Sequence, residues 1–177
     1  KKKPAAITLK LNSLSDESLI RKLTEAALAG VEIKMVIRGI CCMFTENKKF
    51  NRPIQAVSIV DEYLEHARVM IFHNDRKEKV FISSADWMVR NIDHRVEAAC
   101  PVLDQQIADE IRDIIQIQLS DNVKARILNN EQTNQYVNPR NTKKVRSQIE
   151  TYQYLHRKAV PSNRQQSVID PLPGIQG

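Results

Sequence analysis

Cationic and hydrogen-bonding side chains gather where strands are predicted to end. Arg38 directly follows the apolar run 31–37, and His66 and Arg68 stand at the start of the apolar run 68–72. Open α/β sheets bind ligands in the crevice beyond the carboxyl ends of their strands, so a cation there is a candidate anion contact. Arginine suits this task because its planar guanidinium can bind two phosphate oxygens. The sequence therefore predicts an anion site at the edge of a sheet.

His66 adds a side chain that can hold or release a proton near neutral pH, which arginine cannot do. Two interpretations remain open at this point. His66 belongs to the anion site, or it ends a helix predicted over residues 56–65 and complements the negative end of that helix dipole.

A second polar stretch, residues 83–95, contains more charged and hydrogen-bonding groups than a core would tolerate, and apolar residues flank it on both sides. Ser83, Ser84 and Asp86 are expected at the same edge as His66. A carboxylate repels phosphate, so Asp86 is expected to orient a cation, either His66 or an arginine. Alternatively, Asp86 caps a short helix over residues 87–91. Arg95 and Glu97 face a ligand or pair with each other.

The composition excludes several classes of protein. The chain has 177 residues with only four glycines and no GxxxxGK run, so a Walker-type nucleotide site is absent. No window approaches the roughly 18 apolar residues that a membrane helix needs, and no secretory signal is recognisable. Cys41, Cys42 and Cys100 lack zinc or redox spacing, so we expect three buried thiols in a reducing, cytoplasmic setting.

The apolar periodicity predicts one α/β domain. We expect a strand at 7–11, a helix that ends at Gly30 and a parallel strand at 31–37, followed by a loop at 43–55. A helix at 56–65, strands at 68–72, 79–83 and 94–102, and a helix capped by Asp104 come next. A basic helix at 143–157 and an extended tail from residue 161 complete the chain.

Two resemblances follow from these residues. The order His66-Ala67-Arg68, then Ser83-Ser84-Ala85-Asp86, resembles a degenerate phospholipase D pattern, HxKxxxxD followed by GSxN, with Arg68 for the lysine and Asp86 for the asparagine. Longer runs resemble the C-terminal domain of bacterial polyphosphate kinase, namely LKLNSL (9–14), VIRGICC (36–42), SIV (58–60), YLEHAR (63–68) and ISSADWMVRNIDHRVE (82–97). This second resemblance covers roughly residues 1–149.

The polyphosphate kinase resemblance implies a phospholipase-D-like mixed sheet flanked by helices, with a C-terminal basic helix and an extended tail. Residues 1–158 would be the C-terminal domain of a larger transferase and residues 159–177 its tail. The family's phosphorylated histidine lies in a His-x-Lys context in the preceding domain. The His-x-Lys run of this chain, His156-Arg157-Lys158, lies beyond the residues that carry the resemblance. The fragment alone is therefore expected to be inactive.

The resemblance also implies roles for individual residues. Arg38 falls on an arginine that contacts ATP, and His66 falls on a second essential histidine that contacts nucleotide phosphates. Further expected tunnel or orienting residues are Lys10, Asn12, Arg68, Ser83, Ser84, Asp86, Arg90 and Arg95. The implied ligands are ATP, ADP, inorganic polyphosphate and Mg²⁺, with the metal ligands in the missing upstream domain. The implied protein partners are the upstream domains and, in a homo-oligomer, further copies of the full enzyme. No nucleic acid partner is implied.

Two other functions remain open. One is a phospholipase-D-like phosphodiesterase or nuclease, which would require His-x-Lys. The other is a polyanion-binding module that uses the stretch between Asn138 and Arg164, where seven basic residues stand against one acidic residue. Peripheral association of the full enzyme with membranes also stays open.

Overall fold

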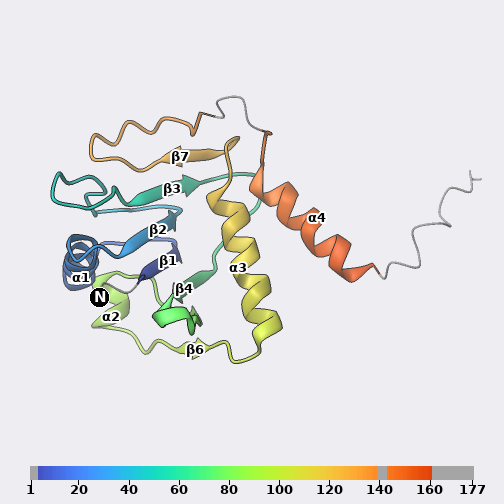
Figure 1. Cartoon of the computed structure of the whole chain (residues 1–177), viewed down its shortest axis with the longest axis horizontal. Coiled ribbons are helices and arrows are strands. Elements are labelled where there is room, and N and C mark those ends of the chain that lie inside the picture. The colour runs from blue at the N-terminus through green and yellow to red at the C-terminus, as the bar shows by residue number, and fades with distance from the viewer. Residues whose placement is uncertain (1–3, 139–142, 161–177) are drawn as a thin grey trace, which may run out of the picture.

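A mixed sheet of seven strands forms the centre of the computed structural model, which describes residues 4–138 and 143–160 (Figure 1). Its strand order is β6-β5-β4-β1-β2-β3-β7. β1, β2 and β3 are parallel, and the other neighbouring pairs are antiparallel. The strands are β1 (Ala6–Leu11), β2 (Glu32–Ile37), β3 (Gln55–Ile59), β4 (Arg68–Phe72), β5 (Lys79–Ser83), β6 (Ala99–Pro101) and β7 (Ala125–Ile127).

The first strand, helix and strand form as the sequence predicts. Asp16 caps α1 (Glu17–Leu28), because its carboxylate accepts a hydrogen bond from the Leu19 amide at 2.9 Å. Gly30 follows the helix with a φ of +92°, a left-handed conformation that glycine adopts without a steric penalty. The crossover then returns the chain to β2 beside β1, with Leu11 opposite Ile37.

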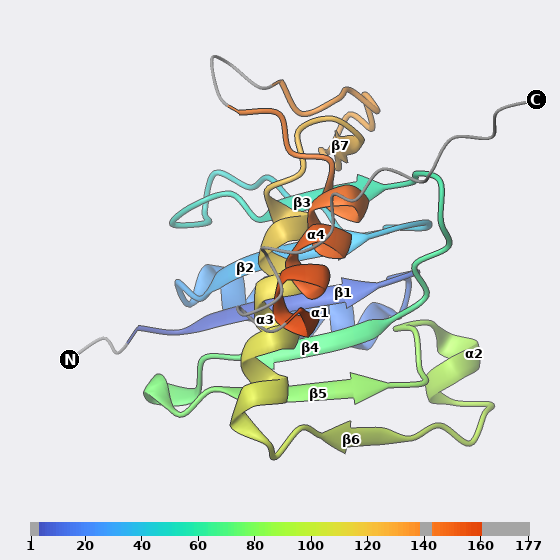
Figure 2. The same cartoon turned by 90° about the vertical axis from the view of Figure 1, so that its right-hand side faces the viewer.

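Helices cover both faces of the sheet (Figures 1 and 2). α1 lies on one face, and α3 (Gln105–Leu119), capped by Asp104, lies on the other. α4 (Ser147–Ala159) packs outside α3, where the Tyr154 hydroxyl donates to Asp113 at 2.7 Å and Lys158 pairs with Glu110 at 3.0 Å. The short helices η1 (Asn74–Arg76) and α2 (Val89–Ile92) belong to the β4–β5 and β5–β6 connections.

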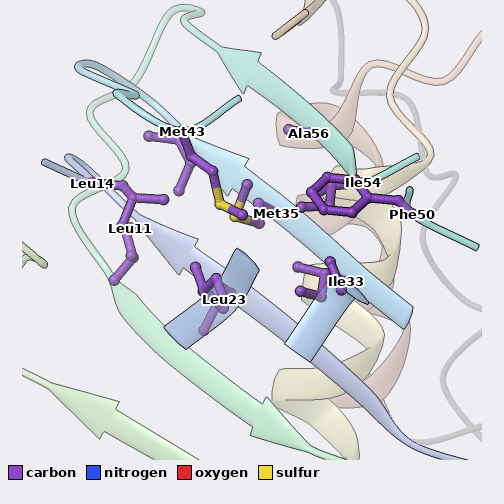
Figure 3. Packing of buried hydrophobic residues seen from close by; sticks show 12 residues of the cluster. Leu11, Leu14, Leu23, Ile33, Met35, Met43, Phe50, Ile54 and Ala56 are labelled. Carbon is purple, nitrogen blue, oxygen red and sulfur yellow. The ribbon is translucent and has the colours of Figure 1, made fainter. Parts of the chain in front are cut away.

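Two apolar clusters hold these layers together. Leu9, Leu11 and Met35 belong to the cluster under α1, which Figure 3 shows from close by. Val36 and Val69 belong to the cluster under α3. Successive strand residues alternate between the faces, so both faces of the central strands are buried. The sheet is therefore a rigid base for the loops at its edges.

Two predicted elements are wrong. Residues 56–65 do not form a helix: β3 ends at Ile59, and an irregular connection follows. β3 lies between β2 and β7 with buried residues on both faces, and a strand buried on both faces lacks the alternation that distinguishes it from a helix. The strand predicted over 94–102 shrinks to Ala99–Pro101, because residues 84–98 form a long connection instead.

Further boundaries and burial also differ from the sequence analysis. The basic helix begins at Ser147 rather than near residue 143, and it continues through Ala159 rather than ending near residue 157. Cys42 and Cys100 are exposed and Cys41 is half-buried, so the expectation of three buried thiols is wrong. The predicted tail from residue 161 lies outside the described residues.

One buried carboxylate joins the ends of three elements. Asp121, which is 1% exposed, accepts hydrogen bonds from the amides of Val123, Lys124, Ala125 and Ser147 at 2.7 to 3.0 Å. Burial raises the pKa of Asp121, but the hydrogen bonds from these amides outweigh burial and leave the pKa below its ordinary value. The carboxylate thus connects the end of α3 to β7 and to the start of α4.

Replacing Asp121 with alanine is expected to lower the free energy of unfolding by about 3 kcal/mol or more, because four amides lose a buried acceptor. Urea denaturation measures this change. The folded pKa is depressed, so the stabilisation is present above the unfolded pKa and is lost as the pH falls through the folded value. Asp93→Asn, at an exposed position, is the control and should leave the unfolding midpoint unchanged.

Candidate functional site

The strands bring the predicted site residues to a single edge of the sheet. β5 is antiparallel to β4, and β4 is antiparallel to β1, so β1, β2, β3 and β5 end where β4 begins. Asn12, Arg38, Arg68 and Ser83 lie at those strand ends. The connection from β3 to β4, residues 60–67, carries His66 along this edge and passes the ends of β2 and β1 (Figure 2).

Arg38 and His66 meet at this edge. One terminal nitrogen of the Arg38 guanidinium lies 3.2 Å from Nδ1 of His66. A guanidinium has only donors, so Nδ1 must accept, and the proton of the neutral ring resides on Nε2. The Arg38 backbone is held as well, because its carbonyl oxygen accepts from the Ser58 hydroxyl at 2.9 Å. The convergence of the two side chains is confirmed, and anion binding by them stays a prediction.

Arg68 and Asp86 form a second pair beside the first. The guanidinium of Arg68 donates to Oδ2 of Asp86 at 3.0 Å, and the two side chains are only 16% and 7% exposed. Asp86 also accepts from the amides of Asn12, at 2.7 Å, and Ser13, at 3.2 Å. Burial raises the pKa of Asp86, but the hydrogen bonds from Arg68 and these two amides outweigh it and lower the pKa overall.

Asp86 therefore orients an arginine, one of the two cations the sequence analysis allowed. The alternative cap on α2 does not form, since that helix starts at Val89 after Met88 and no side chain caps it. The phosphate contact expected of Arg68 stays a prediction, and its paired guanidinium is engaged within the chain.

Lys10 and Asn12 lie behind this surface. Lys10 is 2% exposed, and its ammonium donates to the backbone oxygen of Glu65 at a long 3.4 Å. Burial lowers the pKa of Lys10, an effect that the nearby carboxylate of Glu65 opposes and the guanidinium of Arg38 reinforces. Nδ2 of Asn12 donates to Asp86 at 3.3 Å. Both residues hold the chain's own backbone and Asp86, and their contact with polyphosphate stays a prediction.

The β5–β6 connection is organised around Glu97. Its carboxylate accepts from the hydroxyl of Ser84 and from Nδ2 of Asn91, the latter at 2.6 Å, and these two bonds lower the pKa of Glu97. Ser83 donates to the Ala98 carbonyl at 3.3 Å. Arg90 and Arg95 are exposed on this connection. The expected placement of Arg95 and Glu97 on one strand face is wrong, because neither residue lies in a strand. The charge of Arg95 nevertheless contributes to the lowered pKa of Glu97.

Sequence reasoning missed a pocket of about 450 Å³ next to Arg38 in the chain. Its walls carry no charged side chain and are formed by residues 39–44 together with Ile127, Leu128, Asn129, Asn130, Gln132 and Asn134. Asn130 joins the two walls, because its Oδ1 accepts from the Thr45 amide at 2.9 Å. The two walls are about 85 positions apart, and no local pattern marks such a contact.

The described residues contain no group of three or more histidine, cysteine, aspartate or glutamate side chains that could hold a metal ion. Within the same residues, none of the helices has the length and apolar character required to span a bilayer.

Comparison with known proteins identifies a single family. Residues 1–148 match the family described as polyphosphate kinase C-terminal domain 2. The chain is 52% identical over 153 residues to a polyphosphate kinase of Vibrio cholerae and 47% identical over 152 residues to that of Escherichia coli K12. Each alignment covers 86% of this chain and 22% of the relative.

A solved structure agrees with these relatives. The crystal structure of polyphosphate kinase from Porphyromonas gingivalis superimposes with a TM-score of 0.85 and 47% identity. The superposition covers 88% of this chain and 24% of that chain. The chain thus spans less than a quarter of the length of these polyphosphate kinases.

The contact between Arg38 and His66 predicts one tautomer for the neutral imidazole. In ¹⁵N NMR spectra of this chain above the histidine titration range, His66 is expected to be protonated at Nε2, because Arg38 can only donate to Nδ1. Arg38→Met should shift the tautomer populations toward those of a free imidazole. Arg21→Met, which removes an exposed pair with Glu17 on α1, is the matched control. A His66 protonated at Nδ1 in the unmodified chain would contradict the geometry.

Proposed function

The chain belongs to the polyphosphate kinase family as its C-terminal domain, and we propose that it forms half of the site for reversible transfer of the ATP γ-phosphate to inorganic polyphosphate. The observation that supports this most directly is the Arg38–His66 pair at the carboxyl edge of the sheet. Phosphoryl transfer requires mainly positioning and stabilisation of negative charge on the phosphoryl oxygens. A fixed guanidinium beside an imidazole that can donate a proton supplies both at one place.

The reaction divides into two transfers in this proposal. A histidine of the preceding domain, outside this chain, attacks the γ-phosphorus of ATP, the bond to the bridging oxygen breaks, and ADP leaves. The terminal oxygen of polyphosphate then takes the phosphoryl group from that histidine. In both steps Arg38 binds phosphoryl oxygens, and His66 donates a hydrogen bond from Nε2. This chain alone lacks the nucleophile and should form no polyphosphate.

Magnesium, when bound, would neutralise phosphate charge. The carboxylates near the described site do not suit it well: Asp86 is held by Arg68, Glu97 by Ser84 and Asn91, and Glu65 by Gln118. We therefore assign the metal ligands to the upstream domain and derive no step from the metal here.

The two other functions have less support. A phosphodiesterase of the phospholipase D type uses a lysine two residues after its histidine, and here Arg68 at that position pairs with Asp86. A phospholipase-D-like arrangement is supported only by the placement of His66 and of residues 83–86 at one edge. A polyanion-binding module would rely on the basic residues near α4, and two of these are already neutralised by ion pairs. Arg146 pairs with Asp61, and Lys158 pairs with Glu110.

Arg38→Ala in the complete polypeptide should test the proposal. We expect kcat/KM for ATP in polyphosphate synthesis to fall about 10- to 150-fold, because a charge-assisted hydrogen bond contributes about 1.5 to 3 kcal/mol. Arg21→Ala, at an exposed position on α1, should leave the kinetics unchanged. Unchanged kinetics in Arg38→Ala as well would refute the role of Arg38.

Asp86→Asn should show whether Asp86 positions Arg68 for turnover or contributes to the binding of ATP. The amide keeps an acceptor for the backbone of Asn12 but loses the charge that fixes Arg68, so we expect kcat to fall about tenfold with a smaller change in KM for ATP. Steady-state kinetics of the complete polypeptide measure both constants, with Asp93→Asn as the control. A variant that loses thermal stability and keeps its kcat would show that Asp86 is purely structural.

A further inference from the structure

The connection that carries His66, residues 60–67, is not held by burial of its own apolar side chains. Val60, Tyr63 and Leu64 are 68%, 65% and 74% exposed. A segment with so few buried apolar contacts would open easily without other constraints. Its position must therefore depend on polar contacts with the elements around it.

The start of α4 supplies the first of these contacts. Arg146, directly before the helix, donates from Nε to Oδ2 of Asp61 and from a terminal nitrogen to Oδ1, both at 2.8 Å. The same guanidinium reaches Glu62 at 3.0 Å. The Asp61 side chain is 2% exposed, so this two-point pair is shielded from water on the aspartate side. Arginine forms such planar pairs with a defined orientation, unlike a single point charge.

Gln148 provides a second contact, which involves the backbone. Its Oε1 accepts from the Tyr63 amide at 2.9 Å, and its Nε2 donates to the Tyr63 carbonyl at 2.8 Å. One side-chain amide thus forms the two hydrogen bonds that a residue of a paired antiparallel strand would form. The two residues are 85 positions apart, so this bond pair connects the C-terminal helix to the edge of the sheet.

Glu65, the residue before His66, is held from three sides. Its carboxylate accepts from Nε2 of Gln118 on α3 at 2.8 Å and from Nε2 of Gln148 at 3.3 Å. Its backbone oxygen accepts from Lys10 at the end of β1. These contacts and those of Tyr63 fix the backbone on the amino side of His66, while Arg38 meets the imidazole itself.

We propose that Gln148 and Arg146 are positioning residues for His66. They act by fastening residues 60–67, that is, by holding this connection against α4 through hydrogen bonds and an ion pair. The catalytic consequence rests on the function proposed above for His66, whereas the fastening itself does not. In this proposal α4 supports the site by holding the connection in place and not by binding a polyanion. Loss of the helix would therefore abolish activity even though no contact with a polyanion is removed. The basic residues near its C-terminal end are dispensable for this role.

The test uses the complete polypeptide with Gln148→Glu, which keeps the length of the side chain but removes its N–H donors and places a carboxylate beside Glu65. Hydrogen exchange measured by mass spectrometry should show peptides that cover residues 60–67 exchanging about tenfold faster, because the Tyr63 carbonyl loses its donor and the new carboxylate repels Glu65. Polyphosphate synthesis should show kcat reduced about tenfold and KM for ATP changed less.

Two further variants make the outcome decisive. Gln148→Met adds no charge and replaces Gln148→Glu in the test if that variant fails to fold. It should accelerate exchange in the same peptides. Lys158→Met is the matched control, because Lys158 lies on the same helix as Gln148 but pairs with Glu110 of α3 and contacts no residue of the connection. It should leave exchange in residues 60–67 and the kinetics unchanged.

The outcomes separate the inference from the function on which it depends. Unchanged exchange in residues 60–67 in a folded Gln148 variant would overturn the fastening, and faster exchange with unchanged kcat would overturn the positioning role. If His66→Ala itself leaves kcat unchanged, the proposed function of His66 fails, and the exchange measurement still decides whether Gln148 fastens the connection.

Discussion

The carboxylate of Asp86 is the interaction on which the arrangement of the site depends. It follows β5, yet it accepts from two amides just beyond β1 and from Arg68 at the start of β4. Three strand ends are therefore fixed to one another by a single buried group. Removing one partner of a buried ion pair is costly, because the other charge remains without compensation in a medium of low polarity. The edge of the sheet is consequently rigid before any ligand arrives.

Asp121 repeats this principle at a different junction. Like Asp86, it is a buried carboxylate that accepts from backbone amides of segments distant in sequence, and its pKa is also depressed. Asp121 fixes where α4 begins, and Gln148 then reaches Tyr63 from the first turn of that helix. The position of the connection with His66 thus depends on a carboxylate that lies outside the site.

The parts of this structure that the sequence could predict are local. The cap at Asp16, the stop at Gly30 and the parallel strands follow from short patterns, and the strand ends placed Arg38 and His66 at one edge. The strand at 55–59 was missed because burial on both faces removes its alternation. The bonds between Gln148 and Tyr63 could not be predicted, since two uncharged residues 85 positions apart carry no mutual signal in a single sequence.

The cationic side chains that the sequence analysis proposed as phosphate contacts differ in how far carboxylates of the chain already compensate their charge. Arg68 is paired with Asp86, and Lys10 is buried near Glu65 with a lowered pKa. Among the residues that the structure describes, Arg38 forms no ion pair with a carboxylate and contacts an imidazole instead. An anion that approaches this edge therefore gains most from Arg38, because the charge of Arg68 is already compensated and that of Lys10 is shielded. Pairing within the chain, rather than residue type, thus separates Arg38 from Arg68 and Lys10 as a candidate for the phosphate contact.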